Sequence, residues 1–201
     1  MWKWIAVAAL IYGLVGLLVA TAPPRPAQVD IPFEQLPHVL DFEHPYPGAL
    51  TIPRAHTEVV EVSPGQHALQ WSFKPGKLQV HSLALPCAPP SPDVRELVLM
   101  VKADSELELH IGVIEEDRSL YATLRTAGSE PREIFVPLAE LQPSERFSDE
   151  NGQLDRDQIR HIVLAWHNPR PKDAPPQIEV WVDDVRFEPM APPPPPDLFM
   201  P

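Results

Sequence analysis

Cysteine and glycine are both rare in this chain. Cys87 is the only cysteine, so no intrachain disulfide can form, although a domain of this size can be stable without one. Glycine occurs 8 times in 201 residues, whereas proline occurs 28 times. Because proline fixes φ and lacks a backbone donor, this content argues against long helices and favours short strands with stiff connections.

Basic residues are also few. The chain has 16 Lys and Arg against 28 Asp and Glu, which gives a formal net charge of −12. Such an acidic surface repels phosphate backbones and anionic lipid headgroups. We therefore expect no binding to nucleic acid.

Catalytic signatures are missing from the sequence. It contains no G-x-S-x-G, H-E-x-x-H, P-loop or dinucleotide-binding motif. Cys87 has no evident base beside it, and the acidic run 115–117 is typical of a polar turn. We predict that the protein is not an enzyme.

Charge is absent from Trp4 to Pro24. As a helix this run would be about 30 Å long, enough to cross the hydrocarbon core of a membrane. The alternative is a cleaved signal peptide with a site at Ala20-Thr21-Ala22, but Pro23 would obstruct that cleavage. We predict an uncleaved transmembrane signal anchor at residues 1–22.

The orientation of this anchor follows from its flanking charges. Lys3 and the α-amino group precede the apolar run, and the positive-inside rule places that side in the cytoplasm. The protein would then be a single-pass membrane protein whose domain is extracytoplasmic. Proline-rich segments flank that domain: a linker at 23–37 and a tail at 189–201, both without expected helices or strands.

Between these segments, apolar and polar residues alternate with the period of a β-strand. The run 106–113 places Leu107, Leu109, Ile111 and Val113 on one face. In the run 118–126 we expect the leucines to point inward and Tyr121 to point outward. Similar runs occur at 38–43, 57–63, 67–74, 77–85, 96–103, 132–137, 159–167 and 178–183. About ten strands with regularly spaced turn signals predict an all-β, two-sheet antiparallel β-sandwich over 38–188.

The order of these runs carries a family resemblance. The domain opens with Val39-Leu-Asp-Phe-Glu43 and closes with the strand from Ile178 to Phe187, which contains Val182-Asp-Asp-Val185. It resembles the jelly-roll carbohydrate-binding modules of the galactose-binding-like superfamily, and it is similar to the CIA30-type assembly-factor domain. The resemblance covers roughly 38–188 and implies a jelly roll with a non-catalytic binding function.

The resemblance also implies a cofactor. Many modules of this kind hold a structural calcium ion where the first and last strands meet. The matching residues here are Glu43, Asp183 and Asp184, whose carboxylates are hard oxygen ligands of the type that calcium prefers. Solvated residues at strand ends are the alternative interpretation.

A carbohydrate site needs an aromatic face for stacking and polar neighbours for hydroxyl groups. We expect Tyr121 and Trp181 to be the outward-facing aromatic residues, because Trp71 and Trp166 align with core positions. The polar neighbours would come from the hairpin that includes Tyr121, namely Glu108, His110, Thr123 and Arg125. An ordinary solvated sheet face is the alternative.

Two functions remain open at this stage. The first is a membrane-anchored, non-catalytic module that binds a carbohydrate or polysaccharide. The alternative is a protein-interaction or assembly subunit of a membrane or envelope complex, which suits the acidic surface and the small number of aromatic residues.

Overall fold

The computed structural model describes residues 35–36, 38–43, 46, 48–52, 55–75, 80–145, 151–167 and 175–189. All of them belong to the unit Ile31–Pro201. The predicted anchor at 1–22, nearly all of the linker at 23–37 and the tail after residue 189 lie outside these residues, so those predictions stay untested. Within the described residues, no helix has the length and apolar character that a membrane crossing needs.

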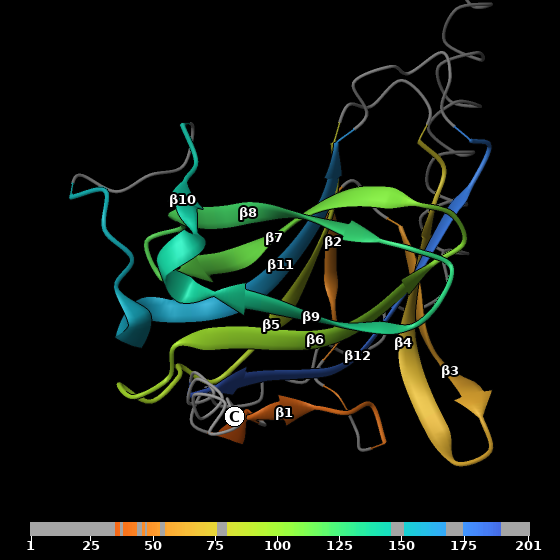
Figure 1. Ribbon diagram of the computed structural model, residues 1–201, viewed down its shortest axis with the longest axis horizontal. Coiled ribbons are helices and arrows are strands. Elements are labelled where there is room, and N and C mark those ends of the chain that lie inside the picture. Colours follow the sequence, from red (N-terminus) through yellow and green to blue (C-terminus); the bar gives the residue numbers. More distant parts are fainter. Residues whose placement is uncertain are drawn as a thin grey trace, which may run out of the picture. The chain divides into compact units, whose positions relative to one another are not determined.

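Two six-stranded antiparallel sheets form the domain (Figure 1). Sheet A has the order β3 (His56–Ser63), β4 (Gln66–Phe73), β12 (Ile178–Glu188), β6 (Glu96–Ala103) and β9 (Arg132–Pro137), and β1 (Val39–Leu40) also pairs with β12. Sheet B has the order β10 (Gln142–Pro143), β8 (Leu120–Ala127), β7 (Leu107–Glu115), β11 (Ile159–His167), β5 (Val80–Pro86) and β2 (Leu50–Ile52). Two 3₁₀ turns, η2 (Leu138–Glu140) and η3 (Arg156–Gln158), complete the described elements. The predicted all-β two-sheet sandwich is confirmed.

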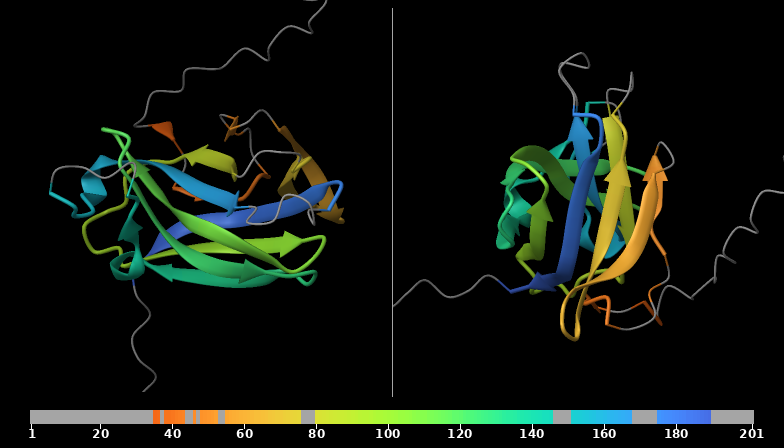
Figure 2. Two further views of the ribbon diagram at one scale, coloured as in Figure 1. Left: turned by 90° about the horizontal axis from the view of Figure 1, so that it is seen from above. Right: turned by 90° about the vertical axis from the view of Figure 1, so that its right-hand side faces the viewer.

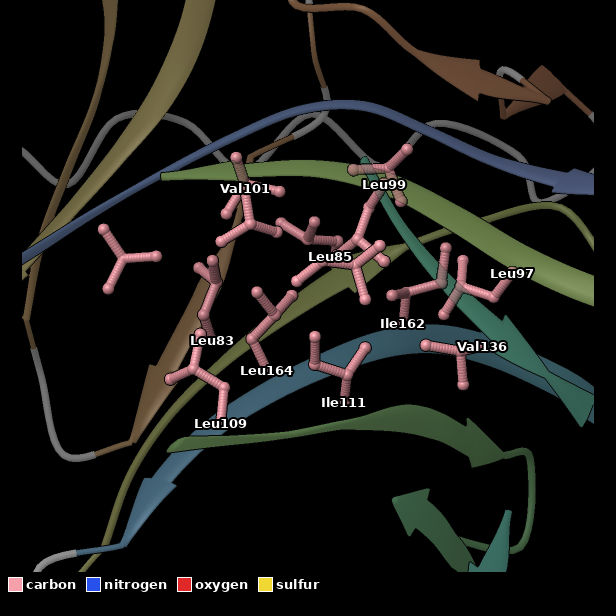
Figure 3. Packing of buried hydrophobic residues seen from close by; sticks show 14 of the residues in the cluster. Leu83, Leu85, Leu97, Leu99, Val101, Leu109, Ile111, Val136, Ile162 and Leu164 are labelled. Carbon is pink, nitrogen blue, oxygen red and sulfur yellow. The ribbon is translucent and has the colours of Figure 1, made fainter. Parts of the chain in front are cut away.

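The core lies between the two sheets, which form opposed layers (Figure 2). Leucine side chains of β5 and β6 meet isoleucines of β7 and β11 there (Figure 3). The alternation predicted for β7 is confirmed, since Leu109, Ile111 and Val113 are fully buried. Burial of each such side chain stabilises the fold by about 1.5–3 kcal/mol. The strands with apolar residues on both faces, β6 and β11, are interior strands of their sheets, as expected.

The facing of β8 differs from the prediction. Tyr121 pairs with Val113 and is only 1% exposed, whereas Leu124 is 44% exposed. Directly opposed residues of an antiparallel pair share a face, so Tyr121 lies on the inward side of sheet B. The prediction that Tyr121 faces outward is therefore wrong. The reason is that β8 carries apolar residues at both odd and even positions, so its sequence does not fix which side is buried.

Candidate binding surface

The six predicted ligand-binding residues do not share one surface. Thr123 pairs with Ile111 and Arg125 with Leu109, which places both on the same inward side of β8 as Tyr121. Arg125 also forms an ion pair with Glu140 at 2.5 Å, which fixes its guanidinium at the edge of the sandwich. The predicted single surface on the β7–β8 hairpin is therefore not formed.

The other three predicted residues lie on outward faces, but on different sheets. Glu108 and His110 alternate with the buried leucines of β7 and so point away from the core of sheet B. Trp181 belongs to β12 of sheet A, where it pairs with Gln70 and Lys102. A role in ligand binding stays a prediction for each of the three.

Trp181 differs from the other tryptophans that the structure describes. Trp71 is fully buried and Trp166 is 7% exposed, as predicted for core residues. Trp181 is half-buried on the outward face of sheet A, because its neighbours Val180 and Val182 fill the core. Lys102 Nζ lies 5.2 Å from the centroid of its ring, a cation–π contact on one ring face.

Hydrogen-bonding groups surround this ring. The carboxylate of Glu179 accepts one hydrogen bond from Gln70 Nε2 at 3.0 Å and another from Gln177 Nε2 at 2.7 Å. Asp104 Oδ2 in turn accepts a hydrogen bond from the backbone N–H of Glu179 at 3.2 Å. The amides and carboxylates next to Trp181 are thus held in place by one another.

An open hollow of about 430 Å³ lies next to this network. It shares Asp104 with the network and is otherwise lined by Arg132 at the start of β9 and by the loops that join β6 to β7 and β8 to β9: Ser105, Glu106, Gly128, Ser129 and Glu130. Its lining carries both carboxylates and a guanidinium. The polar surface beside Trp181 therefore continues onto one end of the sandwich.

Phe135 is a second exposed ring on the same face, and the sequence analysis missed it. It is 49% exposed and pairs with Val98, on the outward side of sheet A. The signal was available, because Ile134 and Val136 alternate with it and both are buried. From the strand spacings, Phe135 and Trp181 are about 16 Å apart across the sheet.

The surface between the two rings carries charged side chains and one methionine. Arg186 pairs with Val98, next to Phe135, and its guanidinium binds Glu133 at 2.6 Å and Glu188 at 2.5 Å. Met100 lies two residues further along β6 toward Trp181, on the same outward side. We call the outward surface formed by Gln70, Met100, Lys102, Phe135 and Trp181 the sheet A face.

The predicted calcium residues lie where β1 and β12 pair, since Leu40 is opposite Val185. Burial, together with the nearby carboxylates of Asp184 and Glu43, raises the pKa of Asp183 to about 6. Asp184 has a positive φ of 49° at an irregularity in the β12 ladder. Asp183 is thus close enough to the carboxylates of Glu43 and Asp184 to interact with them electrostatically.

Glu43 already has a partner in this arrangement. Its Oε1 accepts the backbone N–H of His67 at 2.7 Å, and its Oε2 lies 2.7 Å from His67 Nδ1. This contact lowers the pKa of Glu43 and raises that of His67. Among the described residues, no three His, Cys, Asp or Glu side chains are placed to hold a metal ion. Calcium binding stays a prediction.

Neither a protein-family model nor a curated protein matches the sequence. Several solved structures share the fold. A family 11 carbohydrate-binding module from Clostridium thermocellum, in complex with a β-1,3-1,4-mixed-linked tetrasaccharide, is 14% identical with a TM-score of 0.54, over 70% of this chain and 86% of that one. The solution structure of CtCBM11 is 14% identical with a TM-score of 0.58, over 78% of this chain and 96% of that one.

An exo-β-agarase is similar over only part of its length. It is 14% identical with a TM-score of 0.56, and the match covers 78% of this chain and 26% of that one. At this level of identity, the similarity shows a shared fold. The chain therefore has the jelly-roll β-sandwich of carbohydrate-binding modules, as the resemblance implied.

Proposed function

We propose that this protein is a non-catalytic carbohydrate-binding module and that the sheet A face is its binding surface. One observation carries the proposal. Trp181 and Phe135 are both accessible on one outward face, with hydrogen-bonding side chains around and between them. The fold shared with a module solved in complex with a tetrasaccharide supports this assignment.

The chemistry of the face suits a sugar chain. The apolar C–H faces of pyranose rings pack on aromatic side chains, and hydroxyl groups bond to amides and carboxylates. Gln70 and Glu179 offer such groups beside Trp181. An extended oligosaccharide can span the roughly 16 Å between the two rings. Lys102 lies over one face of the indole, so a sugar that stacks there displaces its ammonium group or bonds to it.

The proposal includes membrane attachment through the apolar run from Trp4 to Pro24. Its support is the length of this charge-free run, which matches the hydrocarbon thickness of a bilayer. The test is fractionation of cells that express the full chain. The protein should stay in the membrane pellet after alkaline extraction, and deletion of residues 1–30 should release it. Full release of the undeleted chain would contradict attachment.

Carbohydrate binding is tested with the full chain in mild detergent against mixed-linked β-glucan, xylan, cellulose and agarose. Trp181→Ala and Phe135→Ala should each weaken binding about tenfold, because each removes one stacking contact. Val62→Ala is the matched control, since Val62 is 52% exposed, like Phe135, but lies on the β3 edge. It should leave binding unchanged.

Two results would overturn the assignment. A folded sample that binds none of the polysaccharides would reject the function. Binding that survives both ring substitutions would reject the sheet A face while keeping the function. If the chain binds no glycan but co-purifies with a membrane protein, the alternative of an assembly subunit replaces the proposal.

A further inference from the structure

The outward face of sheet B has a different composition from that of sheet A. The strand register aligns Ala122, Gly112, Val163 and Ala84 in one row across β8, β7, β11 and β5. The adjacent row contains His110, Ala165 and Ser82. Apart from Val163, which is only 4% exposed, and His110, the middle of this face is therefore a floor of small side chains.

Larger apolar side chains stand at the two margins of this floor. On β2, Leu50 is 50% exposed and Ile52 is 73% exposed. On β8, Leu124 is 44% exposed. Leu50 pairs with Ala84, Ile52 with Ser82 and Leu124 with His110. All three therefore point outward from sheet B. We call this surface, floor and margins together, the sheet B face.

The sheet B face is also nearly free of charge. Among the residues that the register places on it, Glu108 is the only carboxylate, and neither Lys nor Arg occurs. The chain as a whole has a net charge of −12. By contrast, the outward side of sheet A carries Glu58, Glu133, Glu179 and Asp183.

We propose that the sheet B face is a self-association surface that binds a second copy of this chain. Exposed leucine and isoleucine side chains at the margins of a weakly charged sheet face mark an interaction site. Charge favours a second copy on this face, because two acidic chains meet with little repulsion only where carboxylates are scarce.

Shape favours the same occupant. A two-fold axis along the strands brings the β2 margin of one copy over the β8 margin of the other. Leu50 of one copy then lies above the row that contains Ala122 of the other, where a large side chain meets a small one. Ile52 lies above the row that contains Leu124, where two apolar side chains meet. The Gly and Ala floor lets the two sheets approach to the usual spacing of about 10 Å.

The area is sufficient for a specific dimer. From the strand spacing and rise, the face measures on the order of 500 Å² per copy. Two such faces bury about 1,000 Å² in total, which reaches the lower limit of specific interfaces. The dimer should therefore be reversible and dependent on protein concentration.

The test is chemical cross-linking of the full chain in native membranes or mild detergent. Ala165→Cys places a thiol near the centre of the sheet B face, and a long-arm bismaleimide should link it into a dimer. Ser72→Cys is the control on the outward side of sheet A, where the register pairs Ser72 with Glu179. Cys87 contributes little background, because it is only 4% exposed.

A second pair of variants tests the contact itself in the Ala165→Cys background. Leu124→Glu should abolish the cross-linked dimer, whereas Val59→Glu should leave it unchanged. The two sites match in exposure, at 44% and 45%, but Val59 lies on β3 of sheet A. Equal cross-linking from both faces, a product with the mass of a different protein, or a monomer under all conditions would overturn the proposal.

Discussion

The close approach of β7 and β8 at Gly112 makes a sharp stability prediction. A Cβ at Gly112 would lie 1.9 Å from the carbonyl oxygen of Tyr121 and 2.6 Å from Cα of Ala122. Both atoms belong to the backbone of β8, so neither can rotate away. Gly112→Ala therefore forces the two strands apart at the centre of sheet B.

The expected loss is large for a single methyl group. Overpacking of a well-packed core costs about 1–3 kcal/mol, and here a backbone shift is added. We expect Gly112→Ala to lower the free energy of unfolding by about 3 kcal/mol or more. For a domain of this size that corresponds to a fall in Tm of about 6–12 °C.

Gly128 supplies the matched control. A Cβ there would have no heavy atom within 4 Å, and its φ is not positive. Gly128→Ala should change the free energy of unfolding by less than about 0.5 kcal/mol. Urea unfolding followed by tryptophan fluorescence compares the two variants with the wild type. If Gly112→Ala stays within about 1 kcal/mol of the wild type, the two strands are not as close as the structure has them.

Three further predictions concern titratable groups. The pKa of Asp183 is raised to about 6, chiefly by burial and then by neighbouring carboxylates. In the presence of a chelator, the free energy of unfolding should therefore fall as pH rises from about 4 through 6. Asp183→Asn should remove that slope and stabilise the protein by about 1 kcal/mol at pH 8, a value reduced for solvent screening; no gain at pH 8 would refute it. Excess calcium should raise the Tm of the wild type but not of Asp183→Asn, and identical shifts in both would contradict a calcium site there. Burial raises the pKa of the Cys87 thiol to about 12, so maleimide should label it about 1,000-fold more slowly in the folded protein than in urea, as mass spectrometry would show.

Alternation predicted most of the long strands because their two faces differ strongly. In β7 the buried leucines alternate with Glu108 and His110, so period and facing were both readable. In β8 the period was readable but the facing was not, since Leu120, Tyr121 and Leu124 occupy both faces. The tertiary contact with β7 decides which side is buried.

Two of the shortest strands could not be predicted as separate elements, whereas β1 lies within the predicted run 38–43. β10 contains 2 residues and β2 contains 3, too few for a periodic pattern. Their positions depend on pairing with distant strands, such as that of Leu50 with Ala84. Local propensity cannot supply such long-range contacts.

The candidate site was only partly readable for the same reason. The outward position of Trp181 followed from Val180 and Val182 on either side of it. The sequence could not show that β12 pairs with β4 and β6 whereas β7 pairs with β11, which places Trp181 and His110 on the outward faces of different sheets. The site residues that alternation suggests thus divide between two faces of opposite chemistry.

These two faces make a joint prediction. A dimer through the sheet B faces would leave both sheet A faces exposed, on opposite sides of the assembly. Two sites on one dimer raise the apparent affinity for an immobilised polysaccharide by avidity. They do not change the affinity for a short soluble oligosaccharide, which occupies one site at a time. Leu124→Glu should therefore weaken retention on an insoluble polysaccharide by about tenfold or more while leaving the Kd for a soluble tetrasaccharide unchanged. Trp181→Ala should weaken both, and a Leu124→Glu protein that binds the two ligands like the wild type would show that the faces act independently.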